Sequence, residues 1–520
     1  MKKVKLEIID ESIRKYFLNP YVGVPFVILI SILFRYYFTP WDQLSNSQDA
    51  FVFMTEAISL SKGDFSYFGT RFVWPSFLSL FYISLPTATN LEYANVMRVV
   101  SISISVLTIP IVYLISRHYV ERKYAIIAVA LFGIEANLIE NSIFAITEPI
   151  FILIGLLSFY FILRKSEIGF LLSFAFAGLA IDTRLNGAVL FLLVLVFLIL
   201  TVRPLTKLTK TLFLGILVFV AISSPHIIFP LEEGSFPYAG GLNILNTGFT
   251  SVTTPSNYDF SGTDLSPLTR FQNALFNEFL HIFRIMVPFL AIFVPFGIIA
   301  SLQKLDYKIG LLYLVIGISL IVAIPQYTLS IEFRNLLFIL PFFCVLSAIG
   351  LQKISKSVEI RNIFLVLLIA GIILLSFNFL RERYEVDNEL LFEKQQVAQF
   401  IIENLKGRVM GDLYTETIWN TQNVYSGRID GMSGIHSETL SLITPAIPII
   451  SEKQLIEYSL QNKIDYLVVD NNLDRHFPVF EKIYSNEIDF PYLEKIFDSD
   501  YNNYIKYRVK IFEVDYSKLE

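Results

Sequence analysis

The most constraining feature of this sequence is a series of apolar runs, each long enough to cross a lipid bilayer, between residue 21 and about residue 380. A hydrocarbon core about 30 Å thick needs roughly 20 predominantly apolar residues in a helix. The sequence therefore predicts a polytopic α-helical membrane protein with about eleven transmembrane helices. The runs lie at 21–38, 95–116, 124–140, 149–163, 168–183, 186–202, 211–229, 282–302, 308–327, 333–351 and 361–380.

The composition agrees with a membrane protein. Charged residues make up 17% of the 520 residues, whereas soluble domains carry about 25%, and the mean hydropathy is +0.58. The single cysteine, Cys344, excludes a disulfide within the chain and a cysteine-based metal site. The first run, 21–38, lacks a small-residue cleavage site, so we expect an uncleaved helix and no signal peptide.

Lysine and arginine are unevenly distributed over the connections between the runs. The positive-inside rule places the basic connections on the cytoplasmic side, together with a basic arm at 1–20. The alternate connections carry few cations: Lys62, Arg71, Arg184, Arg270 and Arg334. The basic set comprises Lys2, Lys3, Lys5, Arg14, Lys15, Arg117, Arg122, Lys123, Arg164, Lys165, Arg203, Lys207, Lys210, Lys304, Lys308, Lys353, Lys356 and Arg361.

One further apolar stretch, 72–88, is interrupted by Pro75 and Pro86. If it spanned the bilayer, every later basic connection would face outward, against the charge bias. We therefore interpret it as a re-entrant or interfacial segment on the outer side, with Trp74 and Tyr67 as interface anchors.

An odd number of spans with a cytoplasmic N-terminus puts the C-terminus outside the cell. The expected organisation is a transmembrane domain at 21–380, with outer loops at 39–94 and 230–281, and an extracytoplasmic α/β domain at 381–520. In that last part the pattern predicts a helix near 391–405 and a strand near 408–412. A helix–strand unit in SEKQLIEYSLQNKIDYLVVD and a final strand near 507–514 follow.

With this topology, ionisable residues gather at the outer membrane face. Asp49 lies in the first outer loop, and Glu148 opens the fourth helix, where Thr147 is expected to cap it. Arg184 lies at the turn between the fifth and sixth helices, and Arg334 opens the tenth. Ionisable residues at membrane depth are costly and indicate function. Asp182 and Glu332 are weaker, secondary candidates.

Two carboxylates and two guanidinium groups at a membrane face suit transfer of a sugar from a polyprenyl phosphate. A carboxylate can take the proton of an acceptor hydroxyl, and a second anion favours an oxocarbenium-like transition state. The phosphate leaving group needs cations, and the planar fork of arginine matches its oxygens. Asp49 and Glu148 are therefore the predicted catalytic residues, and Arg184 and Arg334 the predicted phosphate-binding residues.

Four short motifs resemble those of the GT-C superfamily of membrane glycosyltransferases, in its dolichyl-phosphate-mannose protein mannosyltransferase-like group. They are QDA with Asp49, AITEPIFIL with Glu148, GLAIDTRLNG with Arg184, and EFRNLLFILP with Glu332 and Arg334. The chain departs from the group's pattern at three positions: Gln48 precedes Asp49, Leu185 follows Arg184, and Trp74-Pro75 replaces a Pro-Pro pair. The resemblance implies an inverting transferase that uses a lipid-phosphate sugar donor and a protein, lipid or glycan acceptor.

Each candidate residue also has a purely structural explanation. Asp49 can cap a helix, Glu148 can favour a helix terminus, Arg184 can pair with Asp182, and Arg334 can extend to the interface. A metal shared by Asp49 and Glu148 remains open, although we expect none. Two other classes of function also remain open: a transporter or lipid flippase, and a non-catalytic scaffold whose outer domain binds a partner.

Overall fold

The structure is a computed structural model of the whole chain. The residues it describes are 16–42, 48–63, 72–86, 88–224, 267–286, 289–303, 306–324, 333–358, 362–383, 388–411, 428–430, 434–436, 440–443, 449, 451–470, 478–485, 490–502 and 504–518.

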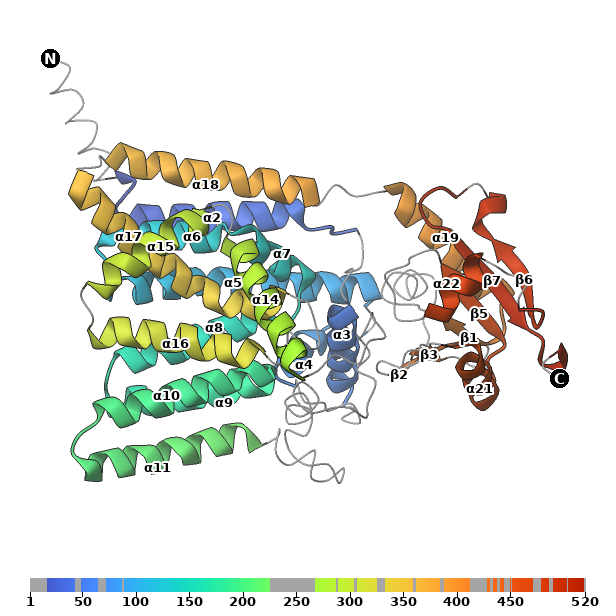
Figure 1. Cartoon of the computed structure of the whole chain (residues 1–520), viewed down its shortest axis with the longest axis horizontal. Helices are drawn as coiled ribbons and strands as arrows, with labels where there is room; N and C mark the ends of the chain where they lie inside the picture. The colour runs from blue at the N-terminus through green and yellow to red at the C-terminus, as the bar shows by residue number, and fades with distance from the viewer. Residues whose placement is uncertain are drawn as a thin grey trace, which may run out of the picture.

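A bundle of apolar helices forms the first three quarters of the chain (Figure 1). Each of the eleven predicted runs overlaps a helix or two consecutive helical segments, as far as the described residues extend. Within the described residues, five helices are long and apolar enough to cross a membrane, or seven if two bent pairs each count as one span. The number eleven therefore stays a prediction. The helices are α2 (Pro20–Phe38), α5 (Asn90–Ser116), α6 (Arg122–Gly133), α7 (Ala136–Phe144), α8 (Glu148–Leu163), α9 (Glu167–Thr183), α10 (Ala188–Thr201), α11 (Leu205–Ile222), α14 (Pro267–Met286), α15 (Phe289–Leu302), α16 (Tyr307–Ala323), α17 (Leu340–Val358) and α18 (Asn362–Arg383).

Two short helices, α3 (Gln48–Ser61) and α4 (Val73–Tyr82), lie at the end of the bundle nearest the C-terminal domain (Figure 1). We call this end the domain end. With 10 residues, α4 is about 15 Å long and too short to cross a bilayer, in agreement with the non-spanning interpretation of 72–88. Trp74, however, is fully buried, so the prediction that it anchors at the interface is wrong.

The segment 267–281 was predicted as outer loop, but it is helical and forms most of α14. Its buried stripe contains Ala274, Glu278, His281 and Ile285, whereas the exposed positions include Phe276 and Phe279. A search for apolar runs misses such a helix because its buried face is half polar. The break to α15 bends the chain by 106°.

The opposite end of the bundle carries the basic connections, and we call it the basic end. Contacts between connections that are far apart in the sequence hold it together. Lys308 Nζ donates to the carbonyl oxygen of His118 at 3.3 Å. The ammonium group of Lys165 lies 3.1 Å from the centre of the Tyr307 ring. Three of the basic connections, those that contain His118, Lys165 and Lys308, therefore meet at this end.

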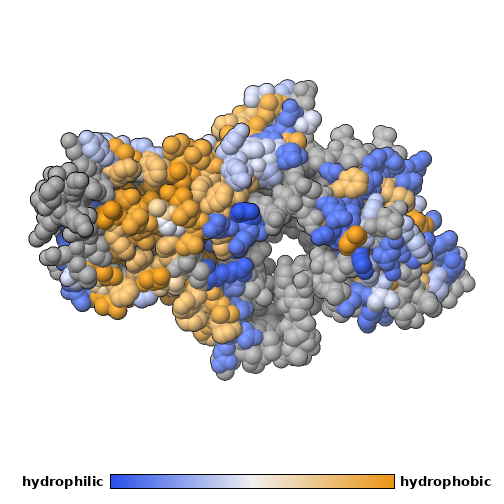
Figure 2. Space-filling model, turned by 90° about the horizontal axis from the view of Figure 1, so that it is seen from above, coloured by the Kyte–Doolittle hydropathy of each residue, from blue (hydrophilic) through white to orange (hydrophobic). Residues whose placement is uncertain are grey.

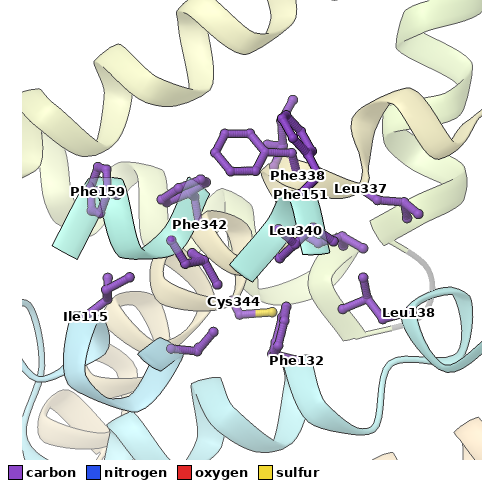
Figure 3. Packing of buried hydrophobic residues seen from close by; sticks show 14 of the residues in the cluster. Ile115, Phe132, Leu138, Phe151, Phe159, Leu337, Phe338, Leu340, Phe342 and Cys344 are labelled. Carbon is purple, nitrogen blue, oxygen red and sulfur yellow. The ribbon is translucent and has the colours of Figure 1, made fainter. Parts of the chain in front are cut away.

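Aromatic side chains in the bundle core pack α8 against the segment that leads into α17. The chain enters α17 through a 3₁₀ helix, η3 (Phe333–Ile339), which packs on α8. Phe151 of α8 contacts Phe338 at 5.3 Å between ring centres, and Phe159 contacts Phe342 at 4.9 Å. Figure 3 shows these rings above Cys344, Phe132 and Leu138. The first residues of α8 and of η3 are therefore held by a continuous hydrophobic core.

The C-terminal part forms a seven-stranded mixed sheet in the order β2-β3-β4-β1-β5-β7-β6. The central strands β4, β1 and β5 are parallel, and the other pairs are antiparallel. The predicted helix and strands appear as α19, β1, α21, β5 and β7. The elements are α19 (Asn388–Asn404), β1 (Gly407–Gly411), β2 (Arg428–Asp430), β3 (Gly434–His436), β4 (Leu440–Ile443), α21 (Glu452–Asn462), β5 (Tyr466–Asp470), α22 (Pro478–Ser485), β6 (Leu493–Asp498) and β7 (Val509–Val514).

The helical part and the C-terminal domain differ in the polarity of their surfaces. In Figure 2 hydrophobic side chains cover the helical part, whereas hydrophilic ones prevail on the C-terminal domain. The start of α2 and the C-terminal domain lie at opposite ends of the bundle (Figure 1). An apolar belt with a polar domain at one end is the surface expected of a multi-pass membrane protein, and the chain has this architecture.

Candidate functional site

Asp49 stands in the first turn of α3, at the domain end. Its carboxylate Oδ2 lies 2.5 Å from Nη1 of Arg334. The two residues are 285 positions apart in the sequence. Because its side chain is 27% exposed, Asp49 remains accessible to a ligand.

Glu148 is the first residue of α8, and the turn before it is held in place from another helix. Ala145 ends α7 in the left-handed conformation with φ 59°. The indole N–H of Trp74, on α4, donates to the carbonyl oxygen of Ala145 at 3.1 Å. Pro149 at the second helical position fits the start of a helix. Trp74 thus positions Glu148, a role that the sequence did not reveal.

The predicted cap by Thr147 is wrong. Thr147 has helical backbone angles, and its side chain makes no capping hydrogen bond. Its hydroxyl instead accepts a hydrogen bond from Nη1 of Arg184 at 3.3 Å. Thr147 therefore belongs to the polar cluster at this site.

Arg184 follows the last turn of α9 in an extended conformation, with φ −153° and ψ 141°. A 3₁₀ turn, η1 (Leu185–Gly187), then leads into α10. A Cβ at Gly187 would lie 2.3 Å from the backbone carbon of Ala180, so only glycine lets this turn pack against α9. The turn directs the Arg184 guanidinium to Glu148, with which it forms an ion pair.

Arg334 lies in the first turn of η3 and connects the two carboxylates. Besides its pair with Asp49, its Nε lies 3.9 Å from Oε1 of Glu148. The four predicted residues therefore form one alternating chain of charges: Asp49, Arg334, Glu148 and Arg184. They come from α3, η3, α8 and the end of α9, which are far apart in the sequence.

Accessibility differs along this chain of charges. The Glu148 side chain is 3% exposed and that of Arg184 is 14% exposed, whereas Asp49 and Arg334 are about one-quarter exposed. The second oxygen of Glu148, Oε2, is buried and has no hydrogen-bond partner among the described residues. A buried carboxylate oxygen without a donor is costly, so the site is suited to receive a donor from a ligand.

Of the two secondary candidates, Asp182 and Glu332, the structure describes only Asp182. Asp182 is fully buried in the last turn of α9. Arg184 forms an ion pair with Glu148. Its position is therefore explained without assuming that it serves only as a partner of Asp182. Glu332 lies outside the described residues.

The donor set does not fit a divalent cation between Asp49 and Glu148. The guanidinium of Arg334 lies between these two carboxylates and contacts both. A hard divalent cation prefers several oxygen ligands without a competing cation. Among the described residues, no group of three His, Cys, Asp or Glu side chains could hold a metal ion.

Comparisons with known proteins agree with these observations. Residues 77–229 match the profile of the family described as dolichyl-phosphate-mannose-protein mannosyltransferase. That range includes Glu148 and Arg184 but neither Asp49 nor Arg334. No protein with curated annotation matches the chain.

Solved structures share the fold at low sequence identity. The crystal structure of the Archaeoglobus fulgidus oligosaccharyltransferase with Zn and sulfate aligns with a TM-score of 0.58 and 12% identity, over 89% of this chain and 69% of that one. ArnT from Cupriavidus metallidurans bound to undecaprenyl phosphate aligns with a TM-score of 0.56 and 12% identity, over 94% and 97%. Arabinofuranosyltransferase AftD from Mycobacteria gives 0.51 and 13%, over 94% and 41%.

The likenesses to solved structures establish the fold of the chain, which is the fold of these membrane glycosyltransferases. Residues 77–229, less than a third of the chain, are similar to the dolichyl-phosphate-mannose-protein mannosyltransferase family.

Proposed function

We propose that the protein transfers a sugar from a polyprenyl phosphate to a hydroxyl group of a protein, lipid or glycan acceptor. The observation that carries the proposal is the alternating chain of Asp49, Arg334, Glu148 and Arg184 at the domain end. A scaffold has no need to gather these four residues from four separate elements. ArnT, whose fold is similar, was crystallised with undecaprenyl phosphate, which supports a donor of this lipid class.

Asp49 acts as the general base in this proposal. It takes the proton of the acceptor hydroxyl while the hydroxyl oxygen attacks the anomeric carbon. The bond between that carbon and the phosphate oxygen breaks, and the polyprenyl phosphate leaves with the bonding electrons. Attack opposite to the leaving group inverts the configuration of the anomeric carbon.

The two arginines bind the phosphate. Guanidinium groups stabilise the charge that grows on the leaving phosphate, because they stay ionised and match its oxygens. Arg334 is paired with Asp49 in this structure. When the donor phosphate takes over Arg334, the Asp49 carboxylate is released to accept the proton. Glu148 stays between the arginines, where its negative charge favours the oxocarbenium-like transition state.

The proposed active site faces the outside of the cell membrane. The support is the charge asymmetry of the bundle, since the positive-inside rule assigns the basic end to the cytoplasm. The basic arm at 1–20 is then cytoplasmic, and the C-terminal domain from about residue 381 lies over the extracytoplasmic face. There it is placed to contact an acceptor.

The test is sugar transfer in vitro by the purified protein and by Asp49→Asn. Radiolabelled polyprenyl-phosphate hexoses serve as donors and a membrane extract as the acceptor. We expect transfer by the wild type and a loss of at least about a hundredfold in Asp49→Asn with the fold intact, since general-base catalysis contributes that much or more. Equal transfer by both proteins would remove Asp49 from the role of base. No transfer from any donor would weaken the enzyme assignment itself.

A further inference from the structure

Three cations converge on His118 at the basic end. Arg117 and His118 follow the last turn of α5, Arg164 ends α8, and Lys308 begins α16. The ammonium group of Lys308 donates to the carbonyl oxygen of His118 at 3.3 Å. The ring of Tyr160 is near both His118 and Arg164. Its centre lies 6.3 Å from the centre of the His118 ring and 5.5 Å from Cζ of Arg164. We call Arg117, His118, Arg164 and Lys308 the cation cluster.

The cations of this cluster are held by neutral groups. Arg117 Nη1 donates to the carbonyl oxygen of Val120 at 2.5 Å, and the Lys308 ammonium is held by a carbonyl as well. Within the part of the chain that the structure describes, no carboxylate lies within 4.0 Å of the charged nitrogens of Arg117, Arg164 or Lys308.

Other cations at the same end do find acids. Lys356 pairs with Glu121 at 2.5 Å, and Lys210 pairs with Glu167 at 3.2 Å. The acid next to the cluster, Asp306, uses its Oδ1 to cap α16. Three like charges repel one another when, as here among the described residues, no carboxylate is in direct contact with them, so an anion from outside the chain would stabilise the arrangement.

The pKa of His118 is sensitive to the positive charges of the cluster. Burial lowers the pKa of the imidazole, and the nearby charges of Lys308, Arg164 and Arg117 lower it further. An anion bound among these cations would oppose their effect and shift the pKa of His118 upward.

We propose that the cation cluster binds the phosphate of an anionic phospholipid headgroup. The position favours a lipid over a free phosphate, because the cluster lies where the membrane-spanning helices end. Basic pockets between helices at the cytoplasmic side are suited to phospholipid headgroups. Beside it, Ile168 in the first turn of α9 is 70% exposed and offers an apolar contact for an acyl chain. A bound lipid would secure the end of α8 opposite to Glu148.

Native mass spectrometry of the purified protein tests the proposal. Phosphatidylglycerol and phosphatidylcholine with the same acyl chains are added to the wild type, to Arg164→Gln and to Arg117→Gln/Arg164→Gln. Each lost cation is expected to lower phosphatidylglycerol retention about fivefold, and the pair about 25-fold, with phosphatidylcholine unchanged. The control is Lys207→Gln, because Lys207 is an exposed lysine at the same end. If this variant loses as much phosphatidylglycerol as the cluster variants, the lipid is held only by the overall positive charge of this end and the proposal is wrong.

A competition arm separates the two sources of phosphate. Inorganic phosphate at the lipid concentration is expected to displace little phosphatidylglycerol. Displacement of most of the lipid would show a site for free anions instead, and the lipid proposal would fail.

A second measurement needs no charge-removing variant. The sequence holds five histidines, so the ring of His118 can be followed by NMR after histidine labelling and assigned with His118→Gln. Phosphatidylglycerol should raise the pKa of His118, and phosphatidylcholine should not. If phosphatidylglycerol binds and the pKa of His118 does not move, the lipid binds elsewhere and the proposal is wrong.

Discussion

The buried pair between Glu148 and Arg184 gives a quantitative prediction for the substitution Glu148→Gln. Glutamine keeps the size of the side chain but leaves the Arg184 guanidinium, which is 14% exposed, without its counter-charge. Removing one partner of a buried ion pair costs about 3–5 kcal/mol. Arg334 also lies 3.9 Å from the same Glu148 oxygen, but it is more exposed and keeps its pair with Asp49. Loss of its contact with Glu148 should therefore contribute less to the destabilisation.

The assay is thermal denaturation of the detergent-solubilised protein, with four variants, one of them Arg184→Gln, compared with the wild type. Glu148→Gln should lower the transition temperature strongly. The double variant Glu148→Gln/Arg184→Gln should recover part of the loss, because no unpaired buried charge remains. Glu121→Gln is the matched control: its pair with Lys356 is about half exposed at both side chains and should contribute at most about 1 kcal/mol.

Two outcomes would refute this reasoning. If Glu148→Gln melts like Glu121→Gln, the pair is not buried in the protein as it exists in detergent. If the double variant is destabilised by the sum of the two single variants, the cost comes from lost packing and not from the uncompensated charge.

Two further predictions concern packing and pH. Gly297→Ala places a Cβ 1.9 Å from the carbonyl oxygen of Leu346. Because this glycine lies where α15 crosses α17, the substitution should destabilise the protein by about 1–3 kcal/mol. In the control Gly310→Ala the new Cβ meets no heavy atom within 4 Å, so the transition temperature should not fall. Burial raises the pKa of Asp498, but hydrogen bonds from Lys495 and from the backbone outweigh it and hold the pKa below the ordinary 3.8. This stabilisation is present above pH 3.8 and is lost as the pH falls further, so protection of β6 from hydrogen exchange should fall there in the wild type and less in Asp498→Asn.

The sequence was sufficient to predict a bundle of apolar helices and the gathering of four charged residues at one end. The spans follow from the length of the apolar runs, and the grouping follows from the alternation of connections between two ends. What the sequence could not supply is the pairing. Asp182 is the nearer partner of Arg184 along the chain, but Arg184 leaves the helix in an extended conformation and meets Glu148 instead.

Two features of the helices were missed, each for its own reason. Helix α14 buries Glu278 and His281 and exposes Phe276 and Phe279, so its pattern is the reverse of a helix on a soluble core. The predicted helix 124–140 is bent by 48° between α6 and α7, and Glu135 accepts the backbone N–H of Leu138 at the break. The first case is hidden by the polar residues on the buried face of the helix, and in the second a local hydrogen bond starts a new helix after the bend.

The link between Asp49 and Arg334 has a consequence for how the protein is made. The two side chains are separated by 285 positions, and synthesis proceeds from the N-terminus at roughly 5–20 residues per second. Asp49 therefore emerges on the order of ten seconds or more before its partner. Until η3 has entered the membrane, the nascent protein has the proposed base but lacks one of the two arginines proposed to bind phosphate, so a chain released before residue 333 should be inactive even if its first helices are correctly inserted.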